Sequence, residues 1–141
     1  MTLEQVFVDT NLFLRYLTND IPEQADRVEQ LLQRAQDGEV QLVTTSMVIA
    51  EIVWTLGSFY KLSREQIRDR VLAILNTPGL TVSEAGLLIE AATNYAAKNV
   101  DFIDAYNVAW MKNAKVSTAY TFDKKHFSRF EEISVKNPAE S

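Results

Sequence analysis

The chain has 141 residues, an apolar fraction of 47% and a formal net charge of −5. This length suits one hydrophobic core, so we predict a single domain over residues 1–141. The absence of cysteine excludes disulfides and thiolate metal sites, and the acidic charge argues against broad, charge-driven binding to nucleic acid.

The N-terminal third alternates apolar runs with helical patterns. Residues 6–8 form a short apolar run, which predicts a strand buried on both faces. We expect a helix over residues 11–17 and a second helix that begins near Pro22, because proline is favoured in the first helical turn. The second helix ends at Asp37-Gly38, and a second short strand follows over residues 41–44.

The middle of the chain predicts two further helices. Ser46 begins the first, whose apolar stripe has helical spacing and consists of Val48, Ile49, Ile52, Val53 and Leu56. Ser63 begins the next, because a serine followed three residues later by a glutamine, here Gln66, forms a capping box. Pro78-Gly79 then breaks the chain before a third strand over residues 80–82.

The C-terminal part continues this alternation. We expect Ser83 to cap a helix that carries Leu88, Ile89 and Ala92. Another helix follows over about residues 101–113, and two short strands follow over residues 118–122 and 133–135. Strands that alternate with helices predict an α/β sandwich with a mainly parallel sheet.

Nothing in the sequence indicates membrane insertion or secretion. No run approaches the roughly 18 apolar residues that would span a membrane. The first residues lack the basic and apolar regions of a signal peptide. We therefore expect a cytoplasmic protein without membrane contact.

Two aspartates follow predicted strands, Asp9 after the first and Asp123 after the fourth. Ligands in open α/β sheets gather at the carboxyl ends of strands. Aspartate is also common in helix caps and turns, so either residue alone suits a structural role equally well. Two matching positions favour a functional site.

Three more acids lie on predicted helices. Asp104 shares a helical arc with Ala105 and Val108 on the expected buried face, where charged groups are rare without a partner. Asp101 lies one turn earlier and fits an N-cap pattern. Glu51 flanks the apolar stripe of its helix, which suits either a solvated face or the wall of a cleft.

Several carboxylates at one place require a cation. Two unit charges about 4 Å apart cost on the order of 4 kcal/mol at an effective dielectric of about 20. Oxygen ligands suit Mg²⁺ or Mn²⁺, which can activate water for phosphodiester hydrolysis. We expect His126, the single histidine, at the surface, so no Ser-His-Asp or Cys-His arrangement competes with this interpretation.

Four segments that span nearly the whole chain resemble one family. They are Val8-Asp9-Thr10-Asn11, Ile49-Ala50-Glu51-Ile52, Asp101-Phe102-Ile103-Asp104-Ala105 and Thr121-Phe122-Asp123-Lys124. Together and in this order they resemble the PIN-domain family, specifically the VapC-like toxins of bacterial and archaeal toxin–antitoxin pairs. The resemblance implies a three-layer α/β sandwich with a five-stranded, mainly parallel sheet and a carboxylate site that binds Mg²⁺ or Mn²⁺. It also implies endonucleolytic cleavage of RNA and inhibition by a small antitoxin. We further expect a homodimer.

The resemblance also assigns residues. Asp9, Glu51, Asp104 and Asp123 are similar to the family's catalytic acids, and Asp9, Asp104 and Asp123 to its metal ligands. Asn11 and Thr121 resemble the family's supporting residues that orient ligands or water, and Asp101 is similar to a further supporting position that is often acidic. For contacts to RNA we consider the basic residues Arg15, Lys124 and Lys125, which could equally serve only solubility.

Two other interpretations start from the same pattern. A PIN-like module without activity could bind RNA or protein. A phospho-receiver domain is also a small acidic α/β unit, but it needs an aspartate after a mid-chain strand. The mid-chain strands here end in Thr44-Thr45 and Val82-Ser83, which disfavours a receiver.

Overall fold

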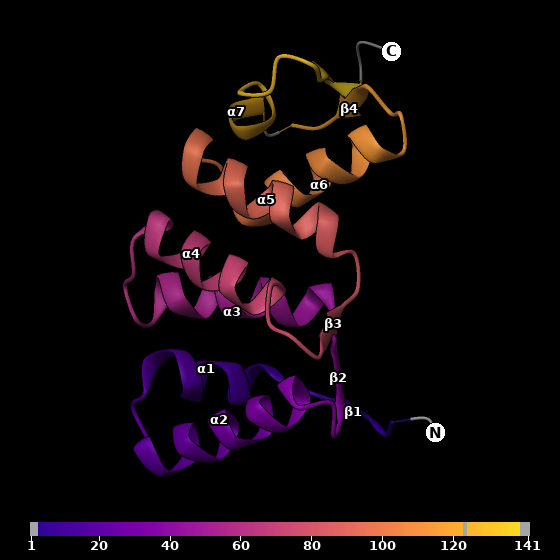
Figure 1. Cartoon of the computed structure of the whole chain (residues 1–141). Coiled ribbons are helices and arrows are strands. Elements are labelled where there is room, and N and C mark those ends of the chain that lie inside the picture. The colour runs from indigo at the N-terminus through magenta and orange to yellow at the C-terminus, as the bar shows by residue number, and fades with distance from the viewer. Residues whose placement is uncertain (1–2, 123, 139–141) are drawn as a thin grey trace. The chain divides into compact units, whose positions relative to one another are not determined.

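The computed structural model describes residues 3–122 and 124–138 (Figure 1). The chain forms two compact units, Met1–Ala85 and Gly86–Ser141. Both units mix helices with short parallel strands, as expected for an α/β protein. The single domain expected over residues 1–141 stays a prediction.

The first unit contains a parallel three-stranded sheet in the order β1-β2-β3. In this sheet Val6 lies opposite Leu42, and Leu42 lies opposite Leu80. Leu42 is fully buried, because it lies on the central strand. The strands are β1 (Gln5–Phe7), β2 (Gln41–Thr44) and β3 (Leu80–Val82). The helices are α1 (Thr10–Thr18), α2 (Pro22–Gln36), α3 (Ser46–Ser58) and α4 (Arg64–Leu75).

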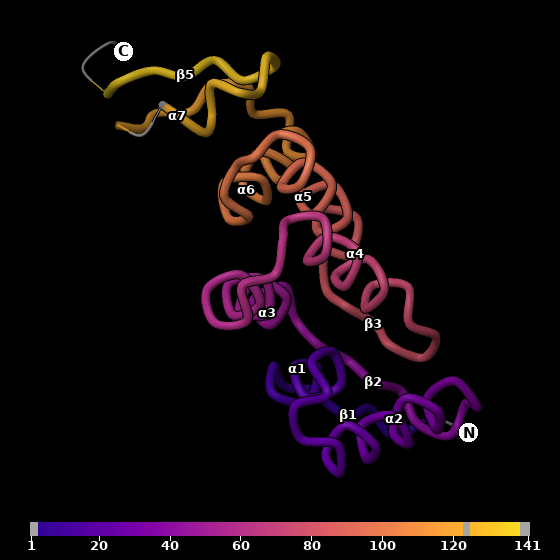
Figure 2. Tube along the Cα trace, turned by 90° about the vertical axis from the view of Figure 1, so that its left-hand side faces the viewer, coloured from indigo at the N-terminus to yellow at the C-terminus, as the bar shows by residue number. Residues whose placement is uncertain are grey.

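Helices α1 and α2 form a hairpin joined by residues 19–21 and lie side by side in both views (Figure 1 and Figure 2). Pro22 occupies the first turn of α2, as predicted. Gly38, just after the end of α2, adopts a φ of +79°, a left-handed conformation that favours glycine.

The local signals of α3 and α4 are also confirmed. Thr45 caps α3 by accepting a hydrogen bond from the Val48 amide at 3.3 Å. All five residues of the predicted apolar stripe of α3 are buried. Ser63 and Gln66 form the complete capping box at the start of α4.

Among the described residues, the second unit combines three helices with two short strands. Its core includes Val100, Ala105, Val108 and Phe130, which are almost fully buried. The Lys112 ammonium group forms ion pairs with Glu90 at 3.2 Å and Glu132 at 3.3 Å. The elements are α5 (Ala85–Lys98), α6 (Phe102–Asn113), β4 (Thr118–Tyr120), α7 (Lys124–Phe127) and β5 (Ser134–Lys136).

The prediction of a single five-stranded sheet is wrong for the described residues. They form the three-stranded sheet and a separate parallel pair of β4 with β5. Each strand has only three or four residues. A short apolar run locates a strand, but its partner is set by contacts between distant parts of the chain.

Two local predictions are also wrong. The strand β1 is not buried on both faces, because it lies at the edge of its sheet and Phe7 is 55% exposed. Ser83 does not cap the helix that follows it, which begins at Ala85. Instead, the Ser83 hydroxyl accepts a hydrogen bond from the Ser46 amide at 3.2 Å and so helps to fix the start of α3. Within residues 3–122 and 124–138, no helix combines the length and apolar character needed to cross a bilayer.

Candidate functional site

Asp9 and Glu51 both contact Thr10 in the first unit. Asp9 is exposed at the N-cap of α1, where its Oδ1 accepts a hydrogen bond from the Thr10 amide at 2.7 Å. The buried Thr10 hydroxyl donates to Oε1 of Glu51, which lies on α3. Thr44 donates to the Val8 carbonyl at 2.8 Å and so fixes the backbone just before Asp9. The end of β1, the start of α1 and the side of α3 thus bring together two predicted catalytic acids.

Asp101, Asp104 and His126 form a second cluster, in the second unit. Oδ2 of Asp104 lies 2.8 Å from Nδ1 of His126, and Oδ2 of Asp101 lies 3.4 Å from the same nitrogen. One ligand atom from each residue lies within 4.8 Å of the others. Asp101 and Asp104 come from the start of α6, and His126 comes from α7, which packs against α6.

His126 was not expected in a site, and its predicted surface position is wrong. Its side chain is only 15% exposed, while those of Asp104 and Asp101 are 21% and 66% exposed. The reason is that residues 124–127 form a helical turn that directs the imidazole toward α6. The one available sequence signal was its position three residues after Asp123.

Asp101 has the backbone position of a helix cap, as predicted, but its side chain makes no capping hydrogen bond. Its carboxylate instead faces His126. The N-cap interpretation of Asp101 is therefore correct for the backbone alone. The side chain lies where it can contribute to a shared ligand group with Asp104.

The other predicted site residues are dispersed. Asp123 lies outside the described residues, as does the side chain of Lys124. The half-buried Thr121 donates its amide hydrogen to the Lys136 carbonyl at 3.0 Å. Asn11 is exposed on α1, and Lys125 is exposed on α7.

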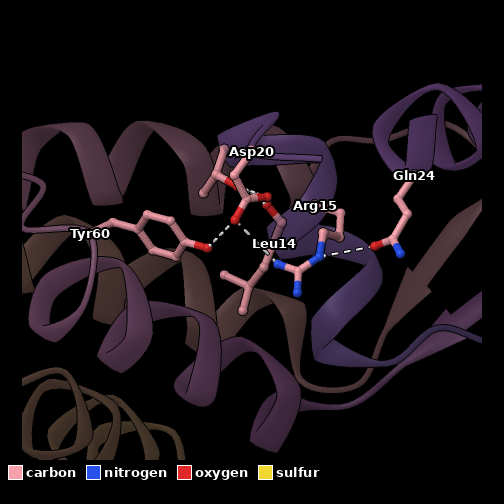
Figure 3. Close-up of polar contacts among 6 residues, drawn as sticks. Leu14, Arg15, Asp20, Gln24 and Tyr60 are labelled. Carbon is pink, nitrogen blue, oxygen red and sulfur yellow. Dashed lines mark hydrogen bonds and ion pairs between the residues drawn. The ribbon is translucent and has the colours of Figure 1, made fainter. Parts of the chain in front are cut away.

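Arg15 belongs to a polar network shown in Figure 3. Its Nε donates to Gln24 at 3.0 Å, and its Nη1 lies 3.4 Å from Oδ2 of Asp20. The Tyr60 hydroxyl donates to the same Asp20 oxygen at 2.8 Å, and Thr18 donates to the other oxygen at 3.0 Å. The hydrogen bond from Tyr60, assisted by Thr18 and Arg15, holds the pKa of Asp20 below its ordinary value.

The donor sets suit a divalent metal ion. The second unit offers two carboxylates and one imidazole nitrogen, and the first unit offers the carboxylates of Asp9 and Glu51. Oxygen ligands fit Mg²⁺ and Mn²⁺, and an imidazole nitrogen is a better ligand for Mn²⁺ than for Mg²⁺. Asp101, Asp104 and His126 could therefore hold such an ion in the second unit.

The chain belongs to the PIN domain family, whose model matches residues 6–133. It is similar to the VapC ribonuclease of Aquifex aeolicus (strain VF5), with 27% identity over 135 residues that cover 94% of this chain and 96% of the relative. The resemblance to VapC-like PIN proteins, based on four short segments, is thereby confirmed.

Proposed function

We propose that this protein is a metal-dependent endoribonuclease and the toxin of a toxin–antitoxin pair. The observation that carries the metal dependence is the grouping of Asp101, Asp104 and His126. Similarity to a protein named VapC ribonuclease over 94% of the chain supports RNA as the substrate. Membership of the PIN domain family supports the same reaction class.

We further propose that Asp9, Glu51, Asp104 and Asp123 act on one phosphodiester. In this proposal Asp104, which belongs to the group with Asp101 and His126, binds the metal together with Asp9 and Asp123. The chain then forms one three-layer PIN-like domain. A bound Mg²⁺ or Mn²⁺ would supply Lewis acidity to the phosphodiester. The support is the match of the PIN domain model to residues 6–133, which include all four acids, and the position of Asp9 two residues after β1.

Glu51 is the residue best suited to act as the general base. Its Oε1 is engaged by the Thr10 hydroxyl, which leaves Oε2 to accept a proton from the attacking water. The water oxygen then bonds to phosphorus, the bond from phosphorus to the leaving oxygen breaks, and that oxygen takes a proton from solvent. Asn11 and Thr121 serve as groups that orient the water or the ligands.

The same proposal includes partners and location. A small antitoxin that covers an acidic site would insert an arginine or lysine there, because a guanidinium group pairs two carboxylates well. We propose a cytoplasmic homodimer that binds RNA through basic residues, including Lys124 and Lys125. Co-expression with the neighbouring open reading frame and affinity capture would recover the antitoxin.

The nuclease proposal is tested with purified protein and structured RNA. We expect cleavage with Mn²⁺ or Mg²⁺ and none with EDTA. Asp104→Asn and Asp9→Asn should each reduce the rate about 100-fold or more, because a charged group at the site is lost. Asp69→Asn is the matched control, since Asp69 is an exposed acid paired with Arg68. Cleavage that survives both EDTA and Asp9→Asn would exclude this mechanism. Binding of RNA without cleavage would instead favour a PIN-like binding module.

A further inference from the structure

A cavity of about 370 Å³ opens between α1 and α2 in the first unit. Its walls combine three apolar side chains with two amides and two guanidinium groups. They are Leu12, Val28 and Leu31, then Asn11 and Gln24, then Arg15 and Arg27. A volume of this size lies at the lower end of the range for small-ligand sites, roughly 300–1,000 Å³.

The charge of α2 is segregated around this cavity. At about 100° per residue, Gln24, Arg27, Val28 and Leu31 share one arc of the helix. The acidic residues Glu23, Asp26 and Glu29 fall outside that arc. The cavity therefore receives a cation from α2 and no carboxylate, although the whole chain has a net charge of −5.

Arg15 is held in place by its neighbours. Gln24 and Asp20 engage its Nε and Nη1, and Tyr60 in turn holds Asp20 (Figure 3). In the described part of the chain, Nη2 of Arg15 has no protein partner. A guanidinium group fixed in this way can direct its remaining hydrogens at an anion without losing much side-chain freedom.

Arg27 is the second cation, and it is exposed. Within residues 3–122 and 124–138, its side chain forms no ion pair or hydrogen bond. Asp20 offsets part of the charge of Arg15, so Arg27 supplies the uncompensated positive charge of the cavity.

The cavity begins close to a candidate catalytic acid. Asn11 follows Asp9 by two residues, and Arg15 follows it by six, along the same helix. At a rise of about 1.5 Å per residue, Arg15 lies about 9 Å along the axis from Asp9. A chain of nucleotides that is bound at Asp9 and runs along α1 toward Arg15 would place its next nucleotide at this cavity.

We propose that the cavity is a subsite for one RNA nucleotide next to the cleaved bond. Arg15 and Arg27 bind its phosphate, and the base lies against Leu12, Val28 and Leu31. The inference rests on the proposed ribonuclease function, whose substrate path it specifies. An acidic peptide could use the same cations, but a bound helix needs a row of apolar anchors along a groove, whereas this cavity is compact and flanked by two arginines.

The test measures binding of a fluorescent single-stranded RNA of randomised sequence to the full chain in EDTA, where cleavage is not expected. Arg27→Gln should weaken binding about 5–10-fold and reduce the salt dependence by about 0.7, the loss of one phosphate contact. Arg34→Gln is the matched control on the same helix, because Arg34 is exposed, pairs with Glu39 and does not line the cavity. It should bind RNA like the wild type. Melting temperatures of both variants verify that they fold.

The outcomes distinguish failure of the subsite proposal from failure of the ribonuclease proposal. If wild-type protein cleaves RNA and Arg27→Gln binds RNA as tightly as Arg34→Gln, the subsite is wrong and the nuclease proposal stands. If Arg27→Gln retains RNA affinity but loses a co-expressed protein partner, the cavity belongs to that partner and the subsite is overturned. If wild-type protein neither binds nor cleaves RNA, both proposals fail. Arg15→Lys provides a second test of the subsite. A loss of RNA affinity despite the retained charge would support a fixed guanidinium contact, and unchanged affinity would contradict it.

Discussion

Thr10 forms hydrogen bonds with two candidate acids. Its amide contacts Asp9, and its hydroxyl contacts Glu51, which is 41 residues away in the chain. Asp9 and Glu51 could each be found from the sequence, but their common partner could not, because helical periodicity reports only neighbours within one element. Thr10 was present in the first family-like segment without any assigned role.

Asp20 gives a residue-scale prediction. Its pKa is lowered mainly by the hydrogen bond from Tyr60, so the folded chain favours the carboxylate more than the unfolded chain does. The resulting stabilisation is present above the ordinary value of 3.8 and is lost as the pH falls through the lower, folded value. Tyr60→Phe should move the Asp20 pKa up toward 3.8 in a carboxyl NMR titration.

The control for this titration is Tyr16→Phe. Tyr16 is 43% exposed and makes no side-chain hydrogen bond within the described residues. That variant should leave the Asp20 titration unchanged. An unchanged Asp20 pKa in Tyr60→Phe would mean that Arg15 and Thr18 are sufficient to hold the carboxylate.

His126 shows what sequence reasoning could not see in the candidate site. The acids Asp101 and Asp104 were recognisable from their spacing on one helix, but the imidazole comes from another helix. A lone histidine between lysines and a phenylalanine looks like an ordinary surface residue. Only the packing of α7 on α6 brings it to 2.8 Å from Asp104.

Among the elements, helices with local signals were predictable. The capping box of α4, Pro22 in α2 and the buried stripe of α3 all depend on residues within a few positions of one another. Strand positions were also close to those found, and β2 and β3 were correct at both ends. Sheet membership was not predictable, since pairing joins residues as distant as Gln5 and Gln41.

Gly79 gives an element-scale prediction. It leads into β3 with a φ of +79°, and an added Cβ would collide with the carbonyl oxygen of Ala35 at the end of α2. Gly79→Ala should therefore lower the free energy of unfolding by about 3 kcal/mol or more, through backbone strain and the collision together. Chemical denaturation monitored by circular dichroism would measure it.

Gly38 provides the matched comparison. It has the same φ of +79°, but an added Cβ would meet nothing within 4 Å. Gly38→Ala should cost only about 1–2 kcal/mol, the strain of a left-handed alanine. The difference between the two variants isolates the close approach of Gly79 to Ala35 in α2. Equal losses would show that α2 moves away without cost.

At the scale of the whole molecule, metal should stabilise the fold. A ligand that binds only the folded state adds about 2.7 kcal/mol at 100 times its Kd. Mn²⁺ should therefore raise the melting temperature of the wild type, and Asp104→Asn should gain much less. Asp69→Asn, which alters an acid outside the cluster, should respond like the wild type.

The opposite result is equally informative. A wild-type protein whose melting temperature ignores both Mn²⁺ and EDTA would remove the metal site from the proposal. The sequence alone predicts that, without metal, Asp104→Asn is more stable than the wild type, because the change relieves charge repulsion among the acids. The contact of Asp104 with His126 reduces that expectation, because the imidazole already offers the carboxylate a partner.

The N-cap position of Asp9 has a consequence for how this gene can change over generations. Asparagine caps a helix about as well as aspartate does, and its amide oxygen can accept the same hydrogen bond from Thr10. One nucleotide substitution converts an aspartate codon into an asparagine codon. If Asp9 is a catalytic acid, as we propose, a lineage under selection to silence the activity can therefore lose the charge and keep the helix. In that case, descendants that carry Asp9→Asn would persist as folded relatives that lack the proposed activity and still compete for the proposed partners.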